Sequence, residues 1–296
     1  MRAIAEFIMR GRMQATLVVA AAAALPLLFW LSAAASALVL LRRGMQDAVT
    51  IVVWAVLPAL AWWYFAEPRT LLVLLGTLSL AQLLRRTQSW VAVLLASVPL
   101  GLLFALVLGE QFQESIARLA QELNTLMQQQ MGEILQQWPE AERARMDSLV
   151  VPVLTGLMAA LLQLLSLLSL MLARYWQAAL YNPGGFAGEF HALRLSPLPA
   201  FGLLLALLLV PNVAPQLAML VPLCTVPLAL AGVALLHGLV AQKRLAGFWL
   251  VGLYVSLLLF LQLIYPLLMV LAIVDSLFDF RGRQRHKPDD AANGEG

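Results

Sequence analysis

Two ionisable residues lie at the ends of long apolar runs. His237 precedes Lys243 by six residues, and Asp275 precedes Arg281 by six. If the runs cross a membrane, such groups are costly to bury and are candidates for function, although both can also reach the interface as ordinary polar side chains. Asp275, Asp279 and Arg281 form one interfacial group. No series of carboxylates follows a run, which disfavours an ion-driven proton relay.

The chain carries no catalytic signature. It has no His-Glu-x-x-His motif, no phosphate loop and no set of serine, histidine and aspartate in a nucleophile motif. His191, His237 and His286 are too scattered for a metal site, and Cys224 is the only cysteine, so no intrachain disulfide can form. We expect no catalytic residue, no metal ligand and no cofactor, and predict that the chain is not an enzyme.

The most distinctive string covers residues 181–195. Its Asn-Pro-Gly-Gly segment is a strong turn signal, and Phe186, Phe190 and Leu193 then fall on one face at helical spacing. The string predicts a turn and a short interfacial helix, which is either an anchor or a docking site for a partner. The candidate docking residues are Tyr181, Asn182, Pro183, Gly184, Gly185, Phe186, Glu189, Phe190, His191 and Arg194.

Prolines are dense in a second stretch. Pro211 to Pro215 predicts a turn, and Pro222 and Pro227 would break the helix that follows. Broken membrane helices free backbone groups that transporters use to bind substrates, whereas a packed kink is the plainer interpretation. The candidate substrate region is Pro211, Asn212, Pro215, Pro222 and Pro227.

Small residues recur near the N-terminus. Ala20 with Ala24, and Ala33 with Ala37, have the spacing that lets membrane helices approach closely. They serve either contacts within the fold or docking to another membrane protein.

The elements that must position these residues follow from composition. Apolar residues make up 62% of the 296 residues and charged residues 12%, against roughly 45–50% and 25% in soluble proteins. Too few polar side chains remain to cover a soluble surface, so we predict an integral membrane protein in contact with the lipid bilayer.

The apolar runs are continuous rather than alternating, which excludes the strands of a membrane barrel. The predicted fold class is all-α, a polytopic transmembrane helical bundle that forms a single membrane domain over 1–296. The runs are 14–41, 48–66, 70–84, 89–108, 149–173, 197–210, 216–241 and 246–279.

Runs 14–41 and 246–279 are longer than one span needs, and they contain Pro26 and Pro266. Each is interpreted as a hairpin of two short helices, with a single long tilted helix as the competing interpretation. Counting these, the chain has eight to ten membrane segments.

Basic residues set the orientation. With both termini in the cytoplasm, 15 of the 19 Lys and Arg residues face inward. The tail 281–296 is predicted to be disordered on the cytoplasmic side. This pattern predicts a multi-pass protein of the bacterial inner membrane. The basic residues lie at helix ends rather than in one patch, so no nucleic-acid partner is expected.

Residues 109–148 form a polar insert that is predicted to lie on the periplasmic side. It carries seven acidic and three basic residues, and one apolar stripe recurs at steps of three and four up to Trp138. The stripe predicts an amphipathic helix over 110–138 that caps the membrane helices, lies on lipid, or pairs with a partner. Its apolar positions are Phe112, Ile116, Leu119, Leu123, Met127, Met131, Ile134 and Trp138.

At the string 181–195 the chain resembles the YybS-like family of bacterial membrane proteins, which carry a domain of unknown function. Weaker matches are Arg10-Gly11-Arg12, the segment 41–44 and the segment 275–281, so the resemblance extends over nearly the whole chain. The family implies a multi-span membrane fold and supplies no catalytic residues.

The family is also distantly similar to the substrate-capture components of energy-coupling-factor transporters, which dock through alanine-lined helix faces. Ala20 and Ala24 match that pattern loosely, and the outer helix 110–138 departs from it. The resemblance implies a substrate-binding or transport-associated component. The alternative is a non-transporting scaffold of envelope or cell-shape assemblies. A closed pocket with convergent polar groups would favour the first, and a filled bundle with an exposed apolar stripe the second.

Overall fold

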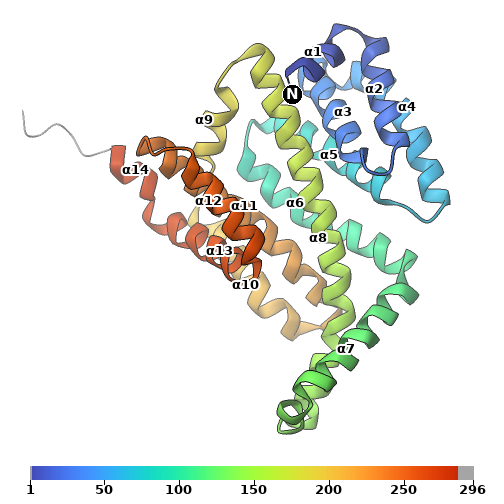
Figure 1. Ribbon diagram of the computed structural model, residues 1–296, viewed down its shortest axis with the longest axis vertical. Helices are drawn as coiled ribbons and strands as arrows, with labels where there is room; N and C mark the ends of the chain where they lie inside the picture. Colours follow the sequence, from blue (N-terminus) through green and yellow to red (C-terminus); the bar gives the residue numbers. More distant parts are fainter. Residues whose placement is uncertain (1, 286–296) are drawn as a thin grey trace, which may run out of the picture. The chain divides into compact units, whose positions relative to one another are not determined.

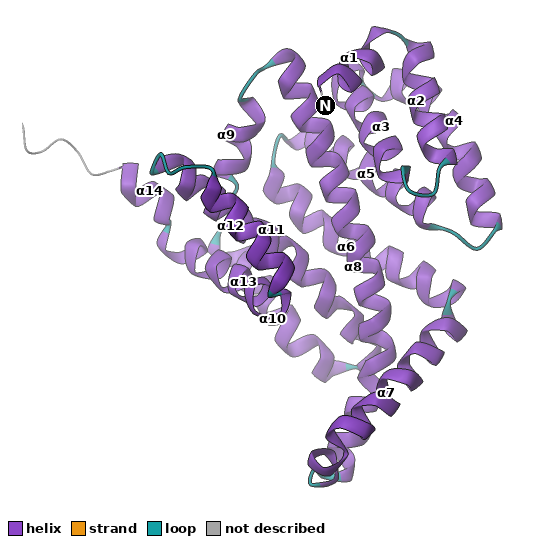
Figure 2. Ribbon diagram, in the orientation of Figure 1, coloured by secondary structure: helices purple, strands orange, loops and turns teal. Residues whose placement is uncertain are grey.

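The computed structural model describes residues 2–285, and within them the chain is helical, without strands (Figures 1 and 2). This confirms the all-α class. The helices are α1 (Arg2–Arg10), α2 (Arg12–Ala24), α3 (Phe29–Arg43), α4 (Met45–Tyr64), α5 (Arg69–Thr87), α6 (Trp90–Gln111), α7 (Gln113–Gln136), α8 (Glu140–Tyr181), α9 (Gly185–Ala192), α10 (Pro197–Val213), the 3₁₀ helix η1 (Pro215–Met219), α11 (Leu220–Gln242), α12 (Phe248–Leu259), α13 (Leu261–Phe278) and α14 (Phe280–Arg285).

Five helical segments are long and apolar enough to cross a membrane, so the chain is a multi-pass membrane protein. They are α4, α6, α8, η1 with α11, and α13, and a sixth span results if α9 and α10, which meet at 65°, are counted as one. The prediction of eight to ten membrane segments was higher, because it counted every apolar run as at least one segment. Among the described residues, α2 and α12 are apolar but have only 13 and 12 residues, too short to span alone.

Packing divides the chain into two compact units where the sequence suggested a single domain. Unit 1 comprises Met1–Phe186 with Leu205–Val226, and unit 2 comprises Ala187–Leu204 with Pro227–Gly296. The chain passes between the units inside α10 and α11 and just after the turn at Asn182–Gly184, where Gly184 has a positive φ of 86°. Of the tail 281–296 that was predicted to be disordered, residues 286–296 lie outside the described residues, while 281–285 belong to α14.

The run 14–41 forms two helices, which confirms the hairpin interpretation. Helices α2 and α3 pack against each other, and the Ser32 hydroxyl donates a 2.8 Å hydrogen bond to the carbonyl of Val19. Residues 32–41 are buried throughout α3. The break falls at residues 25–28, around Pro26, because proline cannot continue the hydrogen-bond ladder.

The run 246–279 is likewise two helices, α12 and α13, which contact each other within unit 2. The break falls at Phe260, whereas Pro266, on which the interpretation as two helices was based, lies inside α13. Gly232 of α11 lies against α13 so closely that a Cβ there would collide with the carbonyl of Leu268. Close approach of this kind is how membrane helices gain contact area without a hydrophobic driving force.

The core of unit 1 is built around α8, which contacts α3, α5 and α6. Gly76 and Gly101 bring α5 and α6 to Ser166 and Gln163 of α8, and Gly156 faces the backbone of Met219 in η1. A buried polar seam therefore follows one face of α8. Its members are Thr155, Gln163, Ser166 and Ser169.

Helix α7 forms with the first turns of α8 an arm of unit 1, visible in green in Figure 1. The predicted amphipathic helix is confirmed, and it ends at Gln136, shortly before Pro139. Ile116 is buried near the base of the arm. Further along, the stripe is uncovered, from 38% exposed at Leu123 to 51% at Ile134.

Candidate functional site

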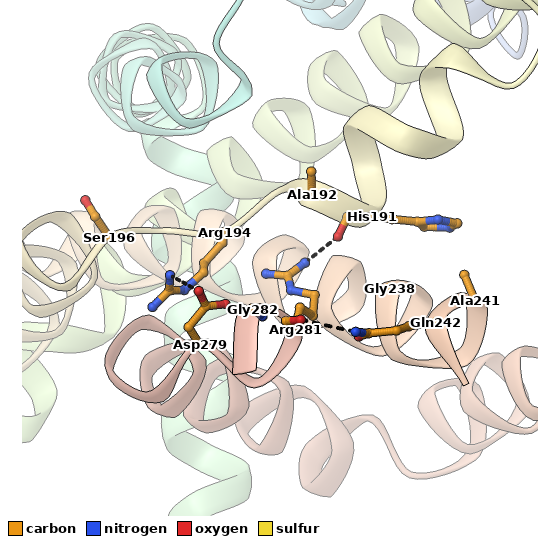
Figure 3. A pocket seen from close by; sticks show the side chains of 10 residues that line it. All are labelled: His191, Ala192, Arg194, Ser196, Gly238, Ala241, Gln242, Asp279, Arg281 and Gly282. Atoms are coloured by element: carbon orange, nitrogen blue, oxygen red, sulfur yellow. Dashed lines mark hydrogen bonds and ion pairs between the residues drawn. The ribbon is translucent and has the colours of Figure 1, made fainter. Parts of the chain in front are cut away.

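An open pocket of about 590 Å³ lies in unit 2 (Figure 3). It is lined by α9, the segment that follows it, the end of α11, and the junction of α13 with α14. The lining residues are His191, Ala192, Arg194, Ser196, Gly238, Ala241, Gln242, Asp279, Arg281 and Gly282.

The junction of α13 and α14 is formed by local hydrogen bonds of two aspartates. Asp279 takes a left-handed conformation with φ of 46°, and its carboxylate accepts the N–H of Gly282 at 3.0 Å. The carboxylate of Asp275 accepts the N–H of Phe280 at 3.1 Å. Short polar side chains tolerate this backbone conformation and satisfy the freed amides. The chain therefore restarts as α14 and carries Arg281 back toward α13.

Arg281 is the most deeply buried charged group of the pocket, with its side chain 11% exposed. Its Nη2 donates to Asp275 Oδ2 at 2.8 Å and to the carbonyl of Leu193 at 2.9 Å, and its Nη1 donates to the carbonyl of His191 at 2.7 Å. Gln242 Nε2 donates to the carbonyl of Arg281 at 3.1 Å. Arg281 thus joins α9 and α13 through its guanidinium and α11 through its backbone carbonyl, and its charge is matched by Asp275.

Arg194 repeats this arrangement nearer the solvent. Its Nε and Nη2 donate to the carbonyls of Asp275 and Ser276 at 3.0 and 2.9 Å, which are among the last carbonyls of α13. The carbonyl of Asp275 also accepts the backbone N–H of Asp279 at 3.0 Å. Its Nη1 lies 3.1 Å from Asp279 Oδ2. Figure 3 shows the Arg194 and Asp279 side chains facing each other at the pocket rim. A cation at a helix C-terminus is also favoured by the helix dipole.

The charges around the pocket balance. Arg194 is paired with Asp279 and Arg281 with the buried Asp275, and Ser196 and Gln242 add neutral polar groups to the lining. Burial, and secondly the charge of Arg281, lower the pKa of His191, so its imidazole is neutral at neutral pH. The site therefore offers hydrogen-bond donors from arginine to a polar ligand, with one carboxylate alongside.

His237 contributes to packing beside the pocket. Its Nε2 lies 2.9 Å from the hydroxyl of Tyr254 on α12, and its ring meets Phe190 edge-on at 5.4 Å between centroids. The histidine predicted to be interfacial thus has a hydrogen-bond partner and an aromatic neighbour within unit 2. This arrangement ties α9, α11 and α12 together.

The structure distributes the string 181–195 over both units. In unit 1, the guanidinium of Arg42 lies 4.0 Å from the ring centroid of Tyr181, and Phe186 meets Trp90 and Tyr175 edge-on. In unit 2, Arg194 belongs to the pocket and Glu189 is half-buried. The turn residues Asn182, Pro183 and Gly184 are exposed and Gly185 begins α9.

The prediction that Pro222 and Pro227 break the helix is wrong, because α11 continues through both, and a neighbouring helix bonds the carbonyl that Pro227 frees. Pro227 has no N–H, so the carbonyl of Leu223 four residues earlier lacks its helical partner. Gln163 Nε2 of α8 donates to that carbonyl at 3.3 Å and to Ser97 Oγ at 2.8 Å. Pro222 and Pro227 are buried, whereas Pro211 and Pro215 are more exposed. The carbonyl of Leu223 is thus a freed backbone group of the predicted kind, and its partner is Gln163 of the neighbouring helix α8.

Asn212, at the end of α10, accepts a hydrogen bond from Arg145 of α8 through its side-chain oxygen. Among the predicted packing residues, Ala33 and Ala37 are completely buried in unit 1. Ala20 is half-buried and Ala24 is exposed on α2. Only the second pair therefore serves the core of unit 1.

Sequence reasoning did not single out Gln163, Ser196 or Gln242. Gln163 was visible as an amide in the middle of the run 149–173, and such a residue in a membrane helix signals an interhelical hydrogen bond. Ser196 and Gln242 carry no such signal, because they lie in polar breaks where these residue types are common.

Comparisons of the chain with protein-family models, with curated proteins and with solved structures found no match. The grouping of described His, Cys, Asp and Glu residues also yields no metal site. The functional assignment thus depends on the chain's own geometry.

Proposed function

We propose that this membrane protein is a substrate-binding, transport-associated component, and that its ligand occupies the polar pocket of unit 2. The observation that carries the proposal is the convergence of Arg194, Asp279, Arg281 and Gln242 on a space of about 590 Å³. Small-molecule sites commonly enclose about 300–1,000 Å³ and hold a few placed polar groups. The site is open on one side, as a component that passes its ligand on would require.

The ligand that fits this lining is small and polar and carries an acidic group. The charges of Arg281 and Arg194 are matched by Asp275 and Asp279, so an acidic group would be held by the guanidinium N–H groups, whose fork suits carboxylate or phosphate oxygens. The resemblance to the YybS-like family, and through it to transporter capture components, supports the same class of function. We place the protein in the bacterial inner membrane with cytoplasmic termini, on the support of the basic residues.

The test is native mass spectrometry of the full chain purified in mild detergent. We expect the protein to retain a small molecule, and Ala241→Trp to abolish that retention by filling the pocket. Ala241 lines the pocket and is exposed, so the indole can be placed without disturbing the arginine cluster.

The matched control is Ala246→Trp, which adds the same side chain at an exposed position in the α11–α12 turn, away from the pocket lining. Retention that is equal in the two variants, or no retained molecule in the parent protein, would contradict the proposal. Thermal unfolding of all three proteins checks that each is folded.

The second candidate function is a scaffold, and the exposed stripe of α7 favours it. Four apolar side chains of the stripe on this otherwise glutamine-rich helix, and Trp138 just beyond its end, are 38–51% exposed: Leu119, Leu123, Met131, Ile134 and Trp138. Uncovered apolar surface on a polar element marks an interaction site. We expect Leu123→Lys with Ile134→Lys to abolish crosslinking of the arm to a protein partner in cells, while Gln129→Lys on the polar face leaves the crosslink unchanged.

A further inference from the structure

We propose that unit 1 binds a phospholipid with an ethanolamine head group at the turn between α4 and α5. At this turn Arg69 and Glu67 form an ion pair, with Arg69 Nη2 2.6 Å from Glu67 Oε2. Two hollows, of about 380 and 160 Å³, both include this pair in their lining. The lipid's charged groups meet the pair, and its acyl chain follows the larger hollow.

The larger hollow is an apolar groove with its only charged groups at one end. Besides Glu67 and Arg69, its walls come from the start of α3, the end of α6 and the middle of α8. The apolar lining residues are Phe29, Leu108, Phe112, Met158, Leu161, Leu162 and Leu165. A surface that is apolar along its length and charged at its end matches a molecule with the same division, such as a phospholipid.

The smaller hollow lies on the ion pair as well and has a different character. Pro26, Trp62 and Thr70 complete its lining. An indole and a carboxylate together form a site for a small ammonium group, because the aromatic face and the negative charge both attract a cation. This hollow takes the amine, while the groove takes the chain.

The ion pair uses only some of its hydrogen-bonding atoms, so others remain for the two charged groups of the lipid head. Arg69 Nε and Nη2 both approach the same oxygen, Glu67 Oε2, at 2.7 and 2.6 Å. Among the described residues, Glu67 Oε1 and Arg69 Nη1 take part in no further hydrogen bond. The two side chains are 43% and 52% exposed. Oε1 therefore accepts an ammonium N–H, and Nη1 donates to a phosphate oxygen.

The ion pair also lies at head-group depth. Helix α4 is a candidate membrane span that ends in Trp62, Trp63 and Tyr64, immediately before Glu67. Tryptophan and tyrosine concentrate where the bilayer meets water. Leu161 and Leu165 lie farther along the span of α8. The groove therefore runs from the interface toward the apolar interior, in the direction that an acyl chain takes.

The head-group chemistry selects ethanolamine over two common alternatives. A glycerol head group offers the phosphate but no cation for Glu67. A choline head group offers a cation without N–H donors, so Oε1 gains no hydrogen bond. Ethanolamine supplies both the phosphate for Arg69 and the donating ammonium for Glu67.

The test measures which lipids remain on the full chain. The protein is exchanged into micelles that contain equal amounts of phosphatidylethanolamine, phosphatidylcholine and phosphatidylglycerol, and the bound lipids are counted by native mass spectrometry. We expect phosphatidylethanolamine to be enriched about threefold, the size of effect that partly exposed charge pairs produce.

Two substitutions separate the roles of the pair. Glu67→Gln abolishes the preference for phosphatidylethanolamine over phosphatidylglycerol, and Arg69→Gln lowers retention of all three lipids. The matched control is Glu114→Gln, which removes the acidic member of another exposed ion pair, Arg118–Glu114 on α7, that does not line the groove. It leaves the preference unchanged.

Three results would overturn the proposal. Equal retention of the three lipids would identify an unselective lipid coat, and preference for phosphatidylglycerol would identify a plain anion site. Displacement of the lipid by soluble phosphoethanolamine would show that the groove contributes nothing. Because the site lies wholly in unit 1, these outcomes are independent of the effect of Ala241→Trp in unit 2.

Discussion

The two units satisfy their buried polar groups in different ways. In unit 1, the seam along α8 consists of amide and hydroxyl groups, and Gln163 Oε1, Ser36 Oγ and Ser169 Oγ are buried without a partner. In unit 2, full charges are buried, and Asp275 and Arg281 satisfy each other and the backbone around them, while the neutral Gln242 Oε1 has no partner. A neutral group can be left partly unsatisfied at modest cost, whereas a charge cannot.

The largest effect is expected from breaking the charge pair of unit 2. Asp275→Ala leaves Arg281 buried without its counter-ion and should cost about 3 kcal/mol of stability, the low end for a buried pair that loses one partner. Thermal unfolding in detergent measures this cost. The double variant Asp275→Leu with Arg281→Met should recover most of it, because no charge remains. If the double variant is as unstable as the single one, charge burial does not explain the loss.

A close contact of the seam in unit 1 gives the next largest effect. In Gly156→Val the new side chain meets the backbone of Met219, which cannot move away as a flexible side chain would. Overpacking of this kind should lower the free energy of unfolding by about 2 kcal/mol. Gly252→Ala serves as the control, since nothing lies within 4 Å of a Cβ at that position. Equal unfolding temperatures in the two variants would contradict the tight contact.

The hydrogen bonds of the seam should count for less. Gln163→Leu removes the donor to Ser97 Oγ and to the carbonyl of Leu223, which Pro227 leaves without a helical partner. We expect a loss of about 1 kcal/mol, in line with hydrogen bonds between membrane helices. A second variant, Gln163→Glu, sharpens the comparison of the units. Chemical denaturation should give it a lower free energy of unfolding than Gln163→Leu, because a lone buried carboxylate costs more than an apolar side chain.

The smallest effect is expected at Ser36. Its hydroxyl is completely buried in α3 and has no hydrogen-bond partner. Ser36→Ala should therefore change the unfolding free energy by no more than about 0.5 kcal/mol, and in the stabilising direction, because a desolvated unpaired group is removed. A clear destabilisation would show that the hydroxyl does have a partner. Ser32→Ala, which loses the bond to Val19, provides the contrast.

Hydropathy and proline positions were enough to predict the all-α class, the hairpin at Pro26 and the amphipathic helix, because each is a property of a continuous stretch of chain. They did not predict the break at Phe260, since Pro266 lies inside α13. The number of helices long enough to cross the membrane was harder to predict from the sequence. A run such as 14–41 has enough apolar residues for a span, but Pro26 divides it into helices of 13 and 15 residues. Composition gives the number of apolar residues in a run, whereas the position of the helix break decides how long each helix is.

The pocket illustrates the limit of local information. Arg194 and Arg281 were both noted from sequence, one in the string after the turn and the other at the end of the last apolar run. The sequence did not predict that they meet at Asp275, because 81 residues separate Arg194 from Asp275. Only the return of α13 toward α9 brings them together.

By itself, the sequence determined that this chain is a helical membrane protein, since the cost of exposing apolar side chains and of leaving backbone groups unbonded acts on each segment separately. The tertiary structure alone decided which polar groups meet: that Gln163 serves the carbonyl freed by Pro227, and that two arginines share the end of α13. Such pairs depend on the register of helices distant in the chain, and packing sets that register.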